Sequence, residues 1–213
     1  MSQPLDTFVP LAALALWLVV LYKNFWRAVL CVAPSTVALD SEDPPDRMQL
    51  PQPLAPLARE LSRLGFSSIG SRREKPVLAA PTIFYEFANA TDKVFATLFL
   101  STSGTPHLYY LTMTQNNGFV ITANYPRPAK EVPGVYLAGA LEGLPPERIY
   151  RAHLRRVEPM GPVGEYTQEG RLAAAKAWFS GPGRSEIRHQ NLHGLVWTAG
   201  TLGILAAALF GRR

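Results

Sequence analysis

Three arginines on one predicted helix have the residue type and spacing that suit binding of anionic groups. Residues 144–158, LPPERIYRAHLRRVE, open with two prolines and then follow a helical hydrophobic period. At 100° per residue, Arg148, Arg151 and Arg155 share one face, and the opposite face is apolar. Arg156 lies at the edge of the basic face. The pattern predicts either a surface for anionic lipid or a partner protein, or a solvated face paired with the helix's own glutamates.

Six other side chains have acid–base or nucleophilic chemistry, but their spacing matches no catalytic motif. They are Glu86, Asp92, His107, Tyr109, Tyr110 and His153. The sequence has no GxSxG, HExxH, P-loop or GxGxxG pattern. With no CxxC pair and only four scattered histidines, we expect neither a metal nor a cofactor. These features favour a protein without enzymatic activity.

Two of these six residues have competing interpretations. Glu86 lies in an apolar predicted strand, either as an outward-facing residue of a half-solvated strand or as a buried acid with a raised pKa. We prefer the outward-facing position because it is simpler. His153 lies on the apolar face of its helix and is interpreted as a hydrogen-bonded core histidine. The alternative function is a membrane-bound enzyme on a lipid or envelope substrate, which would place Glu86 beside His107 in a pocket.

The elements that would position these residues form one domain over residues 54–192. Its first segment, LAPLARELSRLGF, has a helical period and a glycine stop. Period-two alternation then predicts strands, and the pattern afterwards returns to helix. The strands are expected at 82–88, 93–102, 107–115, 118–125 and 134–141, and the helices at 144–158 and 167–179.

Short turns between the predicted strands imply antiparallel pairing. The pair Asn117-Gly118 suits the two positive φ angles of a type I′ hairpin. We therefore predict an α+β fold: a four- to five-stranded antiparallel meander packed by one N-terminal and two C-terminal helices. The two C-terminal helices are expected to cover one sheet face.

Composition separates this domain from the two ends of the chain. Hydrophobic residues make up 47% and charged residues 17% of the 213 residues, and the low charge comes from two charge-free blocks near the termini. The net charge of +5 is too diffuse for a nucleic-acid groove, so nucleic acid is not expected as a partner. The single cysteine, Cys31, excludes an internal disulfide.

The charge-free blocks, residues 7–22 and 194–211, predict transmembrane helices over residues 7–32 and 193–211, the first of which continues past Lys23 and Arg27. A buried core helix is the alternative for the second block, and a cleaved signal peptide is the alternative for the first. The second block carries a small residue at every fourth position, which lets another helix approach closely in lipid. These positions are Ala199, Gly203, Ala207 and Gly211.

The remaining segments complete the predicted topology. Residues 1–6 and 212–213 are short tails, and residues 33–53 form an acidic, proline-rich tether. Four basic residues flank the two spans on the domain side, and two follow the second span at the C-terminus. Because an excess of Lys and Arg favours the cytoplasmic side of a membrane, the domain is expected in the cytoplasm. The sequence thus favours a membrane-tethered binding or assembly module that presents its domain to a partner protein or anionic membrane lipid.

Overall fold

The computed structural model describes residues 4–210, and the chain divides into two compact units. One unit contains the helices at both chain ends together with residues 76–80. The other contains residues 38–75 and 81–182.

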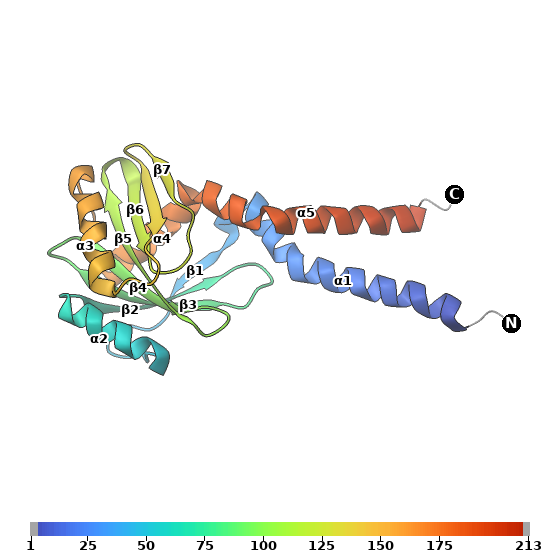
Figure 1. The fold of residues 1–213 in the computed structure, drawn as a ribbon, viewed down its shortest axis with the longest axis horizontal. Coiled ribbons are helices and arrows are strands. Elements are labelled where there is room, and N and C mark those ends of the chain that lie inside the picture. The colour runs from blue at the N-terminus through green and yellow to red at the C-terminus, as the bar shows by residue number, and fades with distance from the viewer. Residues whose placement is uncertain (1–3, 211–213) are drawn as a thin grey trace. The chain divides into compact units, whose positions relative to one another are not determined.

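The second unit is an eight-stranded sheet with three α-helices, counted over the described residues 38–182 (Figure 1). The strands are β1 (Ala38–Ser41), β2 (Ser67–Lys75), β3 (Thr82–Asn89), β4 (Val94–Leu100), β5 (Pro106–Thr114), β6 (Gly118–Ala123), β7 (Lys130–Val132) and β8 (Tyr136–Ala140). The helices are α2 (Ala55–Arg63), α3 (Pro146–Val157) and α4 (Gln168–Ser180). Short 3₁₀ turns lie at Gln52–Leu54, Gln115–Asn117 and Glu158–Met160.

The sheet confirms the α+β class but is larger than predicted, and it is mixed. Its strand order is β1-β2-β3-β4-β5-β6-β8-β7, and β3 to β6 form the expected antiparallel meander. The predicted fifth strand is β8, but it pairs parallel with β6. Three strands were not predicted. β1 lies in the acidic segment, β2 is mostly polar, and β7 is only three residues long, so none shows apolar alternation.

The connection between β5 and β6 is not the predicted type I′ hairpin. Asn117 has φ 55°, but Gly118 has φ −82° and begins β6. Glycine is needed at 118 for another reason: a Cβ there would overlap the hydroxyl of Thr114 and approach the carbonyl oxygen of Val135 within 2.7 Å. The glycine therefore allows close backbone packing, rather than a left-handed turn.

Both faces of the sheet are buried, so each face needs its own helical cover. Side chains of alternating positions, such as Ala96 and Leu98, pack with α2 and α3, while their neighbours, such as Phe95, pack with α4. The two C-terminal helices α3 and α4 therefore cover opposite faces. The expectation that both cover one face was wrong, because a sheet with two apolar faces cannot leave one exposed.

Residues 33–53 are more ordered than an extended tether. A 3₁₀ turn at Pro34–Thr36 follows the first helix, and β1 then pairs with β2. Glu42 forms an ion pair with Arg73 of β2, and Met48 and Leu50 pack against the core. The segment is therefore part of the sheet edge and the core over much of its length.

The first unit contains α1 (Pro4–Val32) and α5 (Gly183–Phe210), which pack against each other (Figure 1). Within the described part of the chain, one stretch is long and apolar enough to cross a membrane: Ala12–Val32 of α1. Only 17% of its apolar window is buried, whereas the core helix of a soluble protein is mostly buried.

The structure therefore matches only one of the two predicted spans. The first turns of α5, residues 183–193, are polar, and its second half is rich in glycine, alanine and threonine. The predicted tails at 1–3 and 211–213 lie outside the described residues.

Candidate functional site

Three of the four predicted arginines line one open groove of about 660 Å³. The groove lies between the exposed face of α3 and the segment that joins β8 to this helix. Its lining residues are Leu141, Leu144, Arg148, Arg151, Ala152, Leu154 and Arg155. It therefore combines an apolar floor with a row of guanidinium groups.

The sequence places the arginines on this face for a local reason. Pro146 occupies the first turn of α3, where its missing N–H costs little. Ile149, Tyr150, His153 and Val157 are buried against the sheet, so the opposite side of the helix must face solvent. Arg148, Arg151 and Arg155 follow there at i, i+3 and i+7, which spans about 10 Å along the axis.

The four predicted arginines differ in their contacts. Arg151 forms an ion pair with Glu147 one turn earlier, with the side chains 72% and 52% exposed. Such an exposed pair contributes only about 0.3–0.5 kcal/mol, so a stronger anionic partner can replace it. Arg156 instead points toward the sheet and lies 3.4 Å from the hydroxyl of Thr122. Arg156 is therefore not part of the groove lining.

The structure confirms that His153 is a hydrogen-bonded core histidine. It is fully buried between two strand threonines, with Nε2 3.0 Å from the hydroxyl of Thr112 and Nδ1 3.0 Å from that of Thr122. Burial, with a smaller effect of the nearby Arg156 charge, lowers the pKa of His153 to about 3. His153 is therefore neutral at physiological pH, and it ties α3 to β5 and β6.

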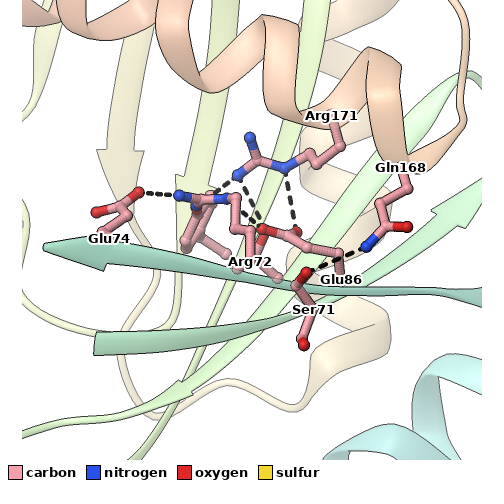
Figure 2. A network of polar contacts seen from close by, with 8 residues as sticks. Ser71, Arg72, Glu74, Glu86, Gln168 and Arg171 are labelled. Atoms are coloured by element: carbon pink, nitrogen blue, oxygen red, sulfur yellow. Dashed lines mark hydrogen bonds and ion pairs between the residues drawn. The ribbon is translucent and has the colours of Figure 1, made fainter. Parts of the chain in front are cut away.

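The position of Glu86 corrects the sequence interpretation. Its side chain is 1% exposed, so the outward-facing prediction was wrong. Figure 2 shows the carboxylate between two arginines, Arg72 on the neighbouring strand β2 and Arg171 on α4. Arg72 Nε donates to Oε1 at 2.6 Å, and Arg171 Nε donates to Oε2 at 3.1 Å. The acid is buried because two cations neutralise it.

Further hydrogen bonds extend this buried network. The Tyr109 hydroxyl accepts from Arg72 Nη2 at 2.9 Å and from Arg171 Nη2 at 2.6 Å. Arg72 also pairs with Glu74, and Thr97 donates to Glu86 at 2.5 Å. Two arginines therefore face two carboxylates. The network joins β2, β3, β4 and β5 to α4, and its chemistry is that of a structural ion cluster.

The pocket expected for the alternative enzyme is not formed by these residues. His107 packs its ring against Phe99 and Tyr125, and partial burial lowers its pKa. Tyr110 donates a hydrogen bond to the carbonyl oxygen of Pro146. Asp92 accepts from the Tyr150 hydroxyl at 2.5 Å and holds the β3–β4 turn against α3. Glu86 and Tyr109 belong to the buried ion network, and the other candidate acids, bases and nucleophiles make packing contacts and hydrogen bonds in the core.

Sequence reasoning missed the residues that complete both features. Leu141 and Leu144 lie in an irregular segment, which has no periodicity to show that they form the groove floor. Arg171 had a readable signal: it shares one helical face with Ala174, Ala175 and Trp178, at i+3, i+4 and i+7. An arginine on such an apolar face needs a buried anion.

The small-residue ladder is not the contact between the two long helices. Ala199, Gly203 and Ala207 are exposed, and a Cβ at Gly203 would meet nothing within 4 Å. Gly211 lies outside the described residues. Over residues 194–207 of α5, the buried positions are instead Gly194, Thr198 and Thr201. Packing of the ladder against another helix stays a prediction.

Replacing Gly194 with valine should separate α1 from α5, because a Cβ at this position would overlap the Cβ of Arg27. Overpacking of this kind costs about 1–3 kcal/mol, which raises the fraction of molecules with the two helices apart by about fivefold to a hundredfold. The lone thiol, Cys31, reports the change, because it is 7% exposed and donates to the carbonyl oxygen of Arg188. We expect faster maleimide labelling of Cys31.

Gly203→Val is the matched control for this experiment, because open space surrounds its missing side chain. Its Cys31 labelling rate should equal that of the unaltered protein. Equal rates in Gly194→Val and the control would show that the close approach at Gly194 does not hold the helices together.

Comparison with known proteins gives no relative: no family model, no curated protein and no solved structure matches this chain.

Proposed function

We propose that this chain is a membrane-anchored, non-enzymatic binding module whose α3 groove holds an acidic, apolar segment of a partner protein. The observation that carries the proposal is the groove itself, in which exposed Arg148, Arg151 and Arg155 border a leucine floor. Arginine with an apolar floor is the composition of protein interfaces, and guanidinium groups pair with carboxylates in a fixed geometry.

The spacing of the arginines favours a protein segment over a single lipid headgroup. The row extends about 10 Å along α3, which exceeds the size of one phosphate. A partner helix with acidic residues at i, i+3 and i+7 offers one carboxylate to each arginine. Its apolar residues would then contact Leu141 and Leu144, as in helix-in-groove recognition.

The anchor in this proposal is α1, with α5 entering the bilayer beside it. The two helices expose large apolar side chains that water does not favour, including Leu16, Leu18, Val196 and Leu202. Lys23, Arg27, Arg184 and Arg188 lie toward the domain side of the apolar stretches. By the positive-inside rule this arrangement supports a cytoplasmic domain with both termini outside.

Reversing two charges tests the groove in the full chain, reconstituted in uncharged phosphatidylcholine nanodiscs. The probe is an amphipathic helical peptide with glutamate at i, i+3 and i+7 beside leucines. Arg148→Glu with Arg155→Glu should weaken peptide binding about a hundredfold, at about 1.4 kcal/mol for each reversed charge. Titration calorimetry measures the affinity.

The control is Arg47→Glu with Arg63→Glu, which changes the net charge equally at exposed positions away from the groove. An equal loss of peptide affinity in both variants would show that the peptide responds only to net charge. It would then contradict binding in the groove. The unaltered protein could instead bind phosphatidylglycerol vesicles through Arg148 and Arg155 and fail to bind the peptide. That result would identify anionic lipid, and not a protein segment, as the ligand of the groove.

A further inference from the structure

The exposed residues of α5 change character abruptly along its length. Before Gly194 they are mainly polar, and after it they are mainly apolar. The polar set is Arg184, Ser185, Arg188, His189, Gln190 and His193. The apolar set includes Val196, Trp197, Leu202 and Ile204. A helix whose exposed surface changes from polar to apolar passes from water into lipid at that point.

The burial pattern of α1 changes at the same level. From Ala12 to Phe25 its exposed side chains are mostly large and apolar, whereas Ala28, Leu30 and Cys31 are buried. The last turn of α1 therefore has the pattern of a packed helix pair in water, with a covered apolar side.

Direct contacts show that the two transitions coincide. Arg27 Nη1 is in hydrogen-bond contact with Nε2 of His193, and the missing side chain of Gly194 lets α5 approach the carbonyl oxygen of Asn24. We call Asn24, Arg27 and His193 the polar layer. Two independent sequence transitions, one on each antiparallel helix, therefore meet at one polar layer.

Aromatic side chains lie next to the polar layer, as they do at membrane–water interfaces. Trp26 and Tyr22 on α1, and Trp197 on α5, lie within about one turn of it. The Arg27 guanidinium lies 5.0 Å from the ring centroid of Trp26. An arginine beside a tryptophan can contact headgroup phosphates while its stem stays in the apolar region.

Helix lengths agree with a bilayer boundary at this level. From Pro4 to Tyr22 the helix rises about 28 Å, and from Leu195 to Phe210 it rises about 24 Å, against a hydrocarbon core of about 30 Å. If α1 instead entered the bilayer up to Val32, Arg27 and the polar residues of α5 beside it would lie in hydrocarbon, at about 2.5–3.5 kcal/mol per charge near the centre.

We propose that the polar layer marks the water boundary of the bilayer and that its cations bind lipid headgroup phosphates. Residues 28–32 of α1 and 183–193 of α5 then form a two-helix stalk outside the membrane. This inference rests on the proposed membrane anchor and specifies how deeply the two helices enter the bilayer. Lys23 directly precedes Asn24 on the membrane side of the layer, one turn before Arg27, and reaches the headgroups through its long stem.

Cysteine accessibility in the full membrane-bound chain tests this depth. In a Cys31→Ser background, single cysteines replace Leu18, Val32, Gln190 and Leu202, all of which are exposed in the unit. A membrane-impermeant maleimide should label positions 32 and 190 and should fail to label positions 18 and 202. Loss of labelling at 32 and 190 would overturn the boundary and leave the anchor intact.

Other results separate failure of the anchor from failure of the boundary. If alkaline carbonate extracted the chain and all four positions were labelled, the proposed membrane anchor would be wrong. Arg27→Leu should deepen insertion and reduce labelling at position 32, whereas Arg47→Leu should leave it unchanged. Unchanged labelling in Arg27→Leu would show that Arg27 does not set the boundary.

Discussion

Replacing Glu86 with alanine is expected to lower the free energy of unfolding of the sheet unit by about 3–5 kcal/mol. Glu86 is the only carboxylate that bonds both Arg72 and Arg171 in the described network. Its removal leaves two guanidinium groups, with side chains 3% and 2% exposed, short of a counter-charge. Urea unfolding, followed by hydrogen exchange of β3–β5 amides in the full chain, measures the loss.

Two further variants make the interpretation specific. Glu131→Ala on the exposed edge strand β7 should change stability by less than about 0.5 kcal/mol. The triple change Arg72→Met, Glu86→Leu and Arg171→Met should recover part of the loss, because apolar replacement of the three most buried charges removes their desolvation cost and leaves only the partly exposed Glu74. An unfolding midpoint of Glu86→Ala equal to that of the unaltered protein would show that the ion cluster does not stabilise the sheet.

Local sequence patterns were sufficient for the centre of the fold and failed at its edges. Strands β3 to β6 were predicted because their apolar residues alternate and their turns are short. β2 was missed because Arg72, Arg73 and Glu74 look like a solvated charge run. Its polar residues are satisfied by partners elsewhere in the fold, so only the completed sheet shows why the strand forms.

The same limit explains the outcomes at the candidate site. The α3 arginines were found because helical periodicity alone places them on one face. Glu86 was misplaced because its partners Arg72 and Arg171 lie 14 and 85 residues away in the chain. A buried ion pair is a tertiary property, whereas an amphipathic helix face is a local one.

Acidification should remove a large stabilising contribution of His153. The folded protein holds the pKa of His153 at about 3, against about 6.5 in the unfolded chain. Between these values the unfolded state binds the proton and the folded state does not. The stability is therefore complete above pH 6.5 and falls by about 1.4 kcal/mol per unit as pH decreases toward 3.

His153→Gln isolates this contribution from the titration of the carboxylates. The variant loses the ionisable ring but keeps one donor and one acceptor for Thr112 and Thr122. Between pH 6.5 and 4.5, the stability advantage of the unaltered protein over His153→Gln should fall by about 2 kcal/mol. His189→Gln, at an exposed histidine, should parallel the unaltered protein. Parallel pH profiles for His153→Gln and the unaltered protein would mean that the imidazole is protonated in the folded state, with Thr112 and Thr122 then accepting its two N–H groups.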